Sequence, residues 1–231
     1  MLPLDPDAAQ RVTVVIIARN EARNLPWVFE RLAGFTGERV LIDGHSTDGT
    51  QALAISAGWR VVTDDGTGKG DAVRRGAAEA QGDIIVYIDA DGSHDPHDIP
   101  ALVAPILREE ADLVLGSRMR GGSDELYASA RELVRMLGSA IITVSINYRF
   151  GYRLSDYQNG FRAIRRDVMR QLGTRERSFT IEQEMAIKAI RLGYRVAEVP
   201  THEYRRRSGE SQIRVRRVWW RFVWCLIRNL A

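Results

Sequence analysis

Ile84-Ile-Val-Tyr-Ile-Asp-Ala-Asp91 is the stretch that decides the fold of this chain. Its first five residues are apolar, which predicts a buried strand, and two aspartates follow where that strand emerges. A continuous apolar run of this length is typical of a parallel sheet that is covered on both faces. Four further runs in the first half of the chain are predicted as strands: Val12–Ala18, Val40–Asp43, Arg60–Val62 and Leu113–Gly116.

Helical patterns separate these strands. They cover Asn20–Leu32, Asp48–Ala57, Gly70–Ala80 and Ile99–Glu109. Strands that alternate with helices of about ten residues form βαβ units, so we predict an α/β, Rossmann-like fold with a mostly parallel sheet flanked by helices. Ligands of such sheets bind at the carboxyl ends of the strands, which is where the polar motifs of this chain fall.

The second half of the chain is less regular. We predict one or two amphipathic helices over Leu126–Asn147, a loop leading into a strand over Asp156–Ile164, a helix over Ile181–Leu192, a strand over Val196–Val199 and an amphipathic C-terminal helix over Ile213–Leu230.

Size and composition fit a single α/β domain of 231 residues with a basic appendage. The only cysteine, Cys225, excludes an internal disulfide and suggests a reducing compartment. We expect no signal peptide, because the first residues lack a basic start followed by an apolar run. No apolar stretch approaches the roughly 18 residues that span a bilayer, so no membrane-spanning helix is expected.

Charge is distributed unevenly along the chain. Residues 205–231 contain eight arginines and one acid, a charge of +7, so the remainder carries −4 within the net charge of +3. A basic tail of this kind indicates contact with an anionic partner, such as phosphate, lipid headgroups or nucleic acid. We therefore divide the chain into a catalytic domain, residues 1–204, and a basic amphipathic segment, residues 205–231.

The carboxylates of Asp89 and Asp91 are the main candidates for metal chemistry. Alternate residues of a strand share a face, which places the two acids about 6.5–7 Å apart along the chain. A hard divalent ion, Mg²⁺ or Mn²⁺, that is also held by a substrate diphosphate would relieve their repulsion with few protein ligands. The pattern Asp-x-Asp by itself is a weak signal, and the alternative is a pair of solvated acids at a strand end.

Other strand ends carry further candidates. Asp43 is able to accept hydrogen bonds from a nucleobase or a ribose, whereas Asp48 and Thr47 are interpreted as caps of the next helix and His45 as a loop residue. The loop Gly66-Thr-Gly-Lys-Gly70 is either a turn or a phosphate site with Lys69. It is not a Walker A loop, and the first turn lacks a dinucleotide-binding glycine motif.

Five segments, in order, resemble motifs of the family 2 glycosyltransferases of the GT-A fold, and most closely those of the dolichyl-phosphate mannose synthase branch. They are Ile42-Asp-Gly-His-Ser-Thr-Asp-Gly-Thr50, Asp89-Ala-Asp-Gly-Ser-His-Asp-Pro96, Gly116-Ser-Arg118, Asp156-Tyr-Gln-Asn-Gly-Phe-Arg162 and Arg206-Arg-Ser-Gly-Glu-Ser-Gln212. A sixth, Val15-Ile-Ile-Ala-Arg-Asn-Glu21, is similar to the family's first strand motif.

The resemblance implies a role for each matching residue. Residues 1–117 would form the nucleotide-sugar half and residues 118–204 the acceptor half. The implied nucleotide-sugar contacts are Ala18, Asn20, Glu21, Asp43, Asp89, Ala90 and Asp91, with Asp89 and Asp91 as metal ligands; Lys69 is added from its place in the glycine-rich loop. The implied catalytic residues are Asp91, Arg118 and Arg206. The implied acceptor contacts are Arg118, Asp156 and Arg206; Arg131 is added from its place in an amphipathic stretch.

Three departures from the motifs affect specificity. Arg19 replaces a tyrosine and Gly44 replaces the second acid of an Asp-Asp pair, and both changes lie near the expected nucleobase wall. Gln212 replaces a lysine of the last motif. The resemblance therefore leaves open whether the donor is GDP-mannose or a UDP-hexose.

The acceptor is predicted to be a polyprenyl or dolichyl phosphate, used in an inverting transfer. Such a phosphate is already ionised near neutrality, so no strong base is needed, and paired arginine N–H groups suit it. The alternative is a hydroxyl of a saccharide or small molecule, for which Glu182 or Glu184 is a candidate base unless both only face solvent. A remote alternative is a nucleic-acid-binding module built on the basic tail.

The C-terminal segment favours a membrane surface over nucleic acid. Its three tryptophans and its arginines suit the bilayer interface, and anionic lipid attracts each basic residue by about 1 kcal/mol. The other interpretation is a helix whose apolar stripe packs on protein. We expect a cytoplasmic protein that is peripherally attached to the cytoplasmic face of a membrane.

Overall fold

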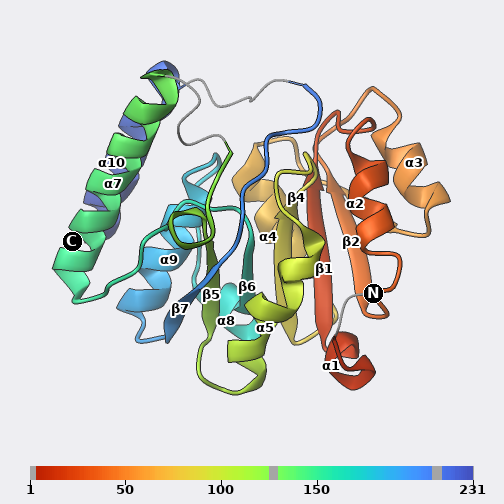
Figure 1. The fold of residues 1–231 in the computed structure, drawn as a ribbon, viewed down its shortest axis with the longest axis horizontal. Helices are drawn as coiled ribbons and strands as arrows, with labels where there is room; N and C mark the ends of the chain where they lie inside the picture. The colour runs from red at the N-terminus through yellow and green to blue at the C-terminus, as the bar shows by residue number, and fades with distance from the viewer. Residues whose placement is uncertain (1–3, 125–129, 210–214, 231) are drawn as a thin grey trace.

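The computed structural model describes residues 4–124, 130–209 and 215–230. In the helices of residues 130–150 and 215–230 it describes side chains from residues 136 and 219 onward. Within these residues a seven-stranded sheet forms the centre, in the order β3-β2-β1-β4-β6-β5-β7 (Figure 1). The strands are β1 Val12–Ala18, β2 Glu38–Asp43, β3 Arg60–Thr63, β4 Ile84–Asp89, β5 Leu113–Ser117, β6 Arg162–Arg165 and β7 Val196–Pro200. Neighbours are parallel except at β6, which is antiparallel to β4 and β5. The predicted fold class is confirmed.

Helices cover both faces of this sheet. They are α1 Pro6–Gln10, α2 Leu25–Arg31, α3 Thr50–Ser56, α4 Lys69–Glu79, the 3₁₀ turn η1 Pro96–Asp98, α5 Ile99–Leu107, α6 Arg118–Gly121, α7 Ala130–Phe150, α8 Arg166–Gln171, α9 Ile181–Arg191 and α10 Val215–Leu230.

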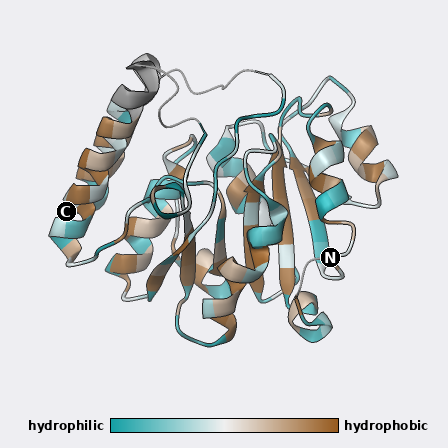
Figure 2. Cartoon of the chain, viewed as in Figure 1, coloured by the Kyte–Doolittle hydropathy of each residue, from teal (hydrophilic) through white to brown (hydrophobic). Residues whose placement is uncertain are grey.

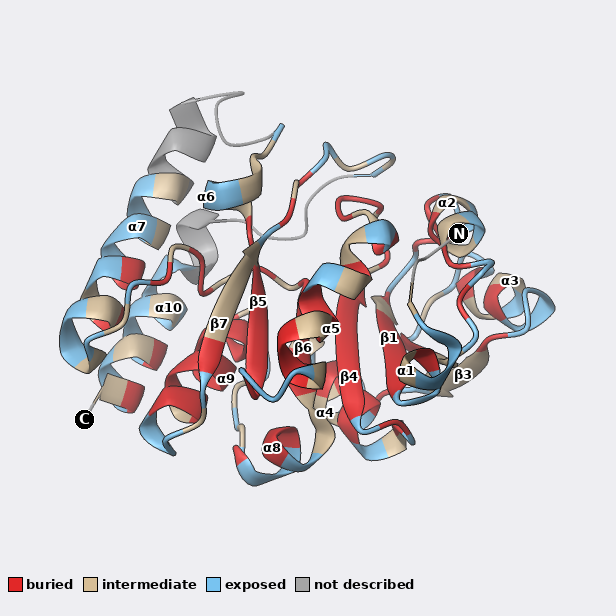
Figure 3. Ribbon diagram, turned by 60° about the horizontal axis from the view of Figure 1, so that its bottom comes forward, coloured by how far each residue is buried: buried red, intermediate tan, exposed pale blue. Residues whose placement is uncertain are grey.

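The alternation of side chains along β1 divides the core in two. Val15 packs on the side of α4 and α9, whereas Val14 and Ile16 pack on the side of α2 and α5. Figure 3 shows the buried strands between these helix layers. Because both faces are covered, the ligand-accessible edge is the one where the parallel strands end.

Helix α2 begins later than the sequence pattern predicts. The pattern includes Asn20, but the helix starts at Leu25. Asn20 adopts a left-handed conformation with φ 57°, and its side chain accepts a hydrogen bond from the Thr47 N–H at 2.8 Å. The segment before α2 is therefore tied to the loop after β2 and cannot continue the helix. Helices α1, α6 and α8 were not predicted, because four to six residues carry too little periodicity.

Helices α7 and α10 lie side by side at the end of the sheet beyond β7, and α10 also packs against α9 (Figure 1). The described part of the segment predicted as one or two helices is a single helix, α7. Among the residues that the structure describes, no helix combines the length and the apolar character needed to cross a membrane.

Candidate active site

Parallel register brings the predicted acids to one edge of the sheet. Asp43 ends β2 and pairs in register with Ala18 at the end of β1. On the other side of β1, Asp89 ends β4 and pairs with Ile17. The backbone of these strand ends is held by hydrogen bonds from the Gly44 N–H to the Ala18 carbonyl and from the Ala90 N–H to the Ile17 carbonyl. Asp43 and Asp89 therefore flank the end of β1.

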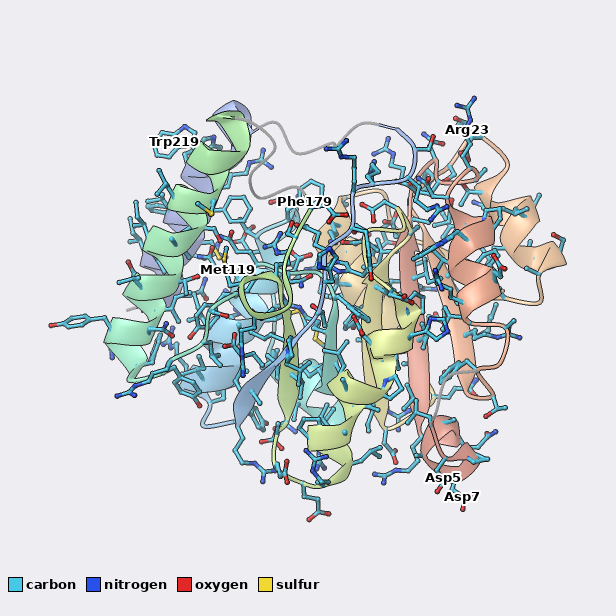
Figure 4. The ribbon with its side chains drawn as sticks, viewed as in Figure 1. Asp5, Asp7, Arg23, Met119, Phe179 and Trp219 are labelled. Atoms are coloured by element: carbon cyan, nitrogen blue, oxygen red, sulfur yellow. The ribbon has the colours of Figure 1, made fainter. Side chains whose placement is uncertain are left out.

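Asp89 faces a buried lysine. The Nζ atom of Lys69, the first residue of α4, lies 2.8 Å from Asp89 Oδ1 and 2.7 Å from Glu182 Oε1. Burial alone would lower the pKa of Lys69, but the two carboxylates raise it, so the lysine is charged. Phe179, labelled in Figure 4, contributes its ring 5.7 Å from Nζ. Lys69 therefore bridges the end of β4 and the start of α9.

Glycines allow this close assembly. A Cβ at Gly160 would lie 2.6 Å from Asp89 Oδ2 and 3.0 Å from Lys69 Nζ. A Cβ at Gly70 would lie 2.0 Å from the Glu176 carbonyl oxygen, and the Gly70 N–H donates to the Arg177 carbonyl at 3.1 Å. The glycine-rich loop is thus both a tight packing element and the element that aims Lys69 at the site.

Asp91 faces an arginine from the other end of the chain. Arg206 donates from Nη2 to Asp91 Oδ2 at 3.1 Å and to Glu21 Oε1 at 3.0 Å. Ser93 donates to Asp91 Oδ1 from its backbone N–H at 3.0 Å and from its hydroxyl at 2.7 Å. Burial would raise the pKa of Asp91, but Ser93 and Arg206 hold it below its usual value. Glu21 differs, because burial outweighs its hydrogen bond from Asn24 and raises its pKa.

The expected nucleobase wall surrounds Asp43. This carboxylate is fully buried, and Oδ2 accepts hydrogen bonds from the Ser46 N–H at 2.9 Å and from Gln51 Nε2 at 2.6 Å. Oδ1 has no hydrogen-bond partner among the described residues. The two departures from the motifs are neighbours here, since a Cβ at Gly44 would lie 3.3 Å from the Cβ of Arg19. The loss of the second acid thus leaves room beside Arg19.

The residues after Asp43 stabilise the loop. Asp48 accepts hydrogen bonds from the Thr50 N–H at the start of α3 and from the Ala22 N–H, each at 3.0 Å. His45 lies with Nε2 3.0 Å from the Asp64 carbonyl oxygen. The N-cap of α3 is Gly49, so neither Asp48 nor Thr47 is the helix cap that the sequence predicts; Asp48 instead ties the start of α3 to the segment before α2. His45 is a loop residue.

Arg118 lies in a separate, closed ion-pair cluster. Its Nε donates to Asp156 Oδ2 at 2.6 Å, its Nη2 donates to Asp156 Oδ1 at 3.0 Å, and its Nη1 donates to Glu203 Oε1 at 3.1 Å. Two of the predicted acceptor residues, Arg118 and Asp156, are therefore bound to each other. Arg131 lies in α7, but its side chain is outside the described residues, as are Gln212 and Arg214.

Sequence reasoning missed two buried groups next to the site. Arg162 is 1% exposed and donates to the backbone carbonyls of Asn159, Tyr157 and Glu182, which fixes the loop before β6. His94 is buried against Phe161, and burial lowers its pKa although Glu203 raises it. Both residues belong to the motifs quoted from the sequence, and that was the only signal of their importance.

The interpretation of Glu182 and Glu184 as a solvated helix face is wrong. Both side chains are buried, at 3% and 0% exposure. Glu182 is part of the Lys69 cluster, with Oε2 unpartnered among the described residues. Glu184 accepts the backbone N–H groups of Arg175 and Glu176 and pairs with Lys188 at 2.9 Å, so it closes the turn before α9. Of the two, only Glu182 belongs to the candidate site.

The donor atoms fit a hard divalent cation that is shared with a ligand. Asp89 and Asp91 offer carboxylate oxygens, the ligand type that Mg²⁺ and Mn²⁺ prefer. Cationic groups of Lys69 and Arg206 lie against these oxygens and balance their charge. No group of three or more His, Cys, Asp or Glu side chains with metal-binding geometry occurs in the described part of the chain. A cation here would need oxygens from a bound diphosphate to complete its coordination.

Comparison with known proteins gives a consistent family. The profile described as "Glycosyl transferase family 2" matches residues 13–173. Glycosyltransferase AglJ of Haloferax volcanii is 33% identical over 209 residues, which cover 89% of this chain and 66% of that protein. An undecaprenyl-phosphate mannosyltransferase of Micrococcus luteus is 30% identical, and the match covers 88% of this chain and 87% of that protein. A dolichol-phosphate mannosyltransferase of Pyrococcus furiosus is 33% identical, and the match covers 88% of this chain and 59% of that protein.

Solved structures share the fold. Glucosyl-3-phosphoglycerate synthase of Mycobacterium tuberculosis, in complex with phosphoglyceric acid, superposes with a TM-score of 0.73 at 25% identity, over 99% of this chain and 85% of that chain. The chain thus spans most of this synthase and of the M. luteus relative, but less than two thirds of the length of the H. volcanii and P. furiosus relatives.

Proposed function

The chain belongs to glycosyl transferase family 2, and from this premise we propose that it transfers a hexose from a nucleotide sugar to a polyprenyl phosphate at a membrane surface. One observation carries the proposal for the donor. Two carboxylates at the end of β4, Asp89 and Asp91, each face a cationic side chain that is able to turn toward a diphosphate. Two relatives whose names specify prenyl phosphates support the choice of acceptor.

The proposed donor site has three parts: an acceptor for the nucleoside, two cationic donors for the diphosphate, and two carboxylates for a divalent cation. Asp43 would accept a nucleobase or ribose hydrogen bond through Oδ1, whose lack of a partner in the described residues is costly for a buried acceptor. Lys69 and Arg206 would donate to phosphate oxygens. A divalent cation held by Asp89, Asp91 and the diphosphate would stabilise the charge of the departing nucleoside diphosphate. The synthase of the same fold has been solved with Mn²⁺ and UDP, which gives a precedent for such a cation.

The proposed reaction is a single displacement with inversion. An ionised phosphate oxygen of the acceptor forms a bond to the anomeric carbon while the bond to the nucleoside diphosphate breaks, and the leaving group keeps the electron pair. Because the nucleophile is already an anion near pH 7, no side chain has to remove a proton. This suits a site in which Glu182, the candidate base that belongs to the site, is paired with Lys69. For Arg118 to bind the acceptor phosphate, its Nη1 would have to leave Glu203.

The outer face of α7 and α10 supports a membrane-bound acceptor. We define the lipid face by its exposed apolar side chains: Leu137, Ile141, Val144, Tyr148, Trp219, Trp220, Val223, Trp224 and Ile227. Their spacing places them along one side of each helix. Figure 2 shows apolar residues along α7, and Trp219 projects away from the sheet in Figure 4. Residues 133–155 and 211–231 contain no acid. Apolar, aromatic and basic segments of this kind suit anionic lipid, so we propose peripheral attachment to the cytoplasmic face of a membrane.

A transfer assay tests the proposed function. GDP-mannose, UDP-glucose and UDP-GlcNAc are each paired with a polyprenyl phosphate or with soluble saccharides, with and without Mg²⁺ or Mn²⁺. We expect glycosylated polyprenyl phosphate from one donor, only when the cation is present. Transfer to soluble hydroxyl acceptors alone would contradict the lipid acceptor and favour the saccharide alternative.

A further inference from the structure

A polar cavity lies beside the candidate active site. It has a volume of about 320 Å³, and we call it the Trp27 pocket. Its lining residues come from α2, from the loop after β4, from the segment after α6 and from the segment after β7: Trp27, Arg31, Gly92, Asp95, Asp124, Tyr204, Arg205 and Arg207. No function assigned above uses this cavity.

Two guanidinium groups are gathered at one aromatic ring. The Cζ atoms of Arg31 and Arg207 lie 4.4 Å and 5.0 Å from the centroid of the Trp27 ring. Cation–π contacts hold each arginine in place but leave its N–H donors available. Two like charges this close to one ring repel each other unless an anion lies between or beside them.

The two carboxylates of the pocket, Asp95 and Asp124, only partly balance the charge of its three arginines. Asp95 accepts the His97 N–H at 3.0 Å, and its contact with Arg31 Nε is 3.9 Å, too long for a hydrogen bond. Asp124 lies 2.9 Å from His202 Nε2. Arg31 Nε is buried without a hydrogen-bond partner among the described residues. The side chains of Arg205 and Arg207 have no carboxylate of a described residue within 4.0 Å. The pocket therefore has more donors than acceptors.

The pocket shares its wall with the active site. Gly92 follows Asp91, has φ 74°, and a Cβ there would lie 3.0 Å from Arg207 Cδ. The Arg207 N–H donates to the Asp91 carbonyl at 3.4 Å, while the neighbouring Arg206 side chain pairs with the Asp91 carboxylate on the other side. One extended segment thus directs Arg206 into the active site and Arg207 into the Trp27 pocket.

From these contacts we propose that the Trp27 pocket is a binding site for a phosphate monoester group, separate from the proposed donor diphosphate site. The paired N–H donors of a guanidinium group match two phosphate oxygens in geometry. The Nε atom of Arg31, which has no hydrogen-bond partner among the described residues, supplies a buried donor. The volume is at the lower end for small-molecule sites, and the described residues of the lining include no aliphatic side chain, so the site takes the phosphate group and a small polar remainder rather than a lipid tail. Occupation would also fix the segment that carries Arg206.

Titration with inorganic phosphate and with glycerol 3-phosphate, followed by calorimetry in the absence of nucleotide and metal, tests the proposal. We expect Arg31→Gln and Arg207→Gln each to weaken binding at least tenfold. Arg108→Gln is the matched control, because Arg108 is exposed at the end of α5 and pairs with Glu110. Its affinity should stay within twofold of the unchanged protein. Asp91→Asn should retain phosphate binding even though it is expected to lose transfer, which separates this proposal from the proposed reaction.

The source of the phosphate is distinguished by a second arm with nanodiscs that contain phosphatidic acid. Tighter binding to these nanodiscs than to neutral ones, lost in Arg207→Gln, would identify a lipid headgroup. Binding of glycerol 3-phosphate alone would identify a soluble phosphorylated compound. Thermal unfolding checks that each variant is folded, and Arg207→Lys, which keeps the charge but not the fork, should recover part of the affinity. Unchanged phosphate affinity in both glutamine variants, or an equal loss in Arg108→Gln, would overturn the proposal.

Discussion

Two arginine–carboxylate clusters lie near the same edge of the sheet and differ in how far solvent reaches their acids. In the cluster of Arg118, the side chains of Asp156 and Glu203 are 1% and 10% exposed. In the cluster of Arg206 and Lys69, Asp91 and Asp89 are 18% and 29% exposed. A buried pair is costly to separate, whereas partners near solvent can be exchanged. We therefore expect the first cluster to stabilise the fold and the second to exchange its cations for ligand.

The largest expected effect falls on the cluster of Arg206 and Lys69, which we call the open cluster. Asp91→Asn removes one of the two proposed metal-binding carboxylates while keeping the shape of the side chain. We expect transfer to fall at least about a thousandfold, roughly 4 kcal/mol of transition-state stabilisation. Urea unfolding should change by less than about 1 kcal/mol, because the amide keeps the size of the side chain and Arg206 keeps Glu21 as a partner. Loss of folding together with activity would remove the distinction between the clusters.

The closed cluster should respond in stability. Asp156→Asn leaves the buried Arg118 without its bidentate partner, and only Glu203 remains to pair with it. We expect the free energy of unfolding to drop by about 3 kcal/mol, the low end for breaking a buried ion pair. Equilibrium unfolding in urea measures this drop. The matched variant is Asp167→Asn, an exposed acid paired with Arg165, which should cost less than 1 kcal/mol.

Acid pH provides a second test of the closed cluster. Burial would raise the pKa of Asp156, but Arg118 and the hydrogen bonds to the carboxylate hold it below its ordinary value. A depressed pKa in the folded state contributes stability that is present above the unfolded value, about 4, and is lost as the pH falls through the folded value. Unfolding free energy should therefore decline below about pH 4, and Asp156→Asn should show a shallower decline. Parallel pH profiles would argue against a depressed pKa at this residue.

The smallest effect is expected at the lipid face, which is far from both clusters. Trp224→Ala should weaken binding to anionic vesicles about tenfold, because one exposed tryptophan would no longer be buried in the interface. Ile55→Ala on α3, equally exposed, is the control and should not change vesicle binding. Sedimentation with vesicles measures both, and removal of residues 213–231 should release the protein. Unchanged sedimentation of the shortened chain would refute attachment through α10, and a shift to a smaller oligomer would indicate a protein partner instead.

The sheet and the acids at its edge were predictable because their signals are local. The apolar run 84–88 predicts the strand, and the two aspartates that follow it mark the carboxyl end of that strand, where ligands bind. The closed cluster was not predictable in the same way. Arg118 and Glu203 are 85 residues apart, and Lys69 and Glu182 are 113 apart, so only the folded chain reveals that each cation already has a partner.

The antiparallel strand β6 illustrates the same limit. Its four residues, Arg162-Ala-Ile-Arg165, are too few to indicate its direction in the sheet. Its position between β4 and β5 brings Gly160, in the loop before it, against Asp89. The burial of Glu182 and Glu184 was also hidden, because a charged helix turn looks solvent-exposed until a buried lysine and two backbone N–H groups are found opposite it.

The central claim is that the carboxylates of Asp89 and Asp91 share a divalent cation with the donor diphosphate. An anomalous difference map from crystals soaked with Mn²⁺ and a sugar nucleotide tests it most directly. We predict a single strong peak within coordination distance of both carboxylates, with Lys69 or Arg206 moved onto phosphate oxygens. A peak at any other acids, or none beside Asp89 and Asp91 when the nucleotide is bound, would contradict the account.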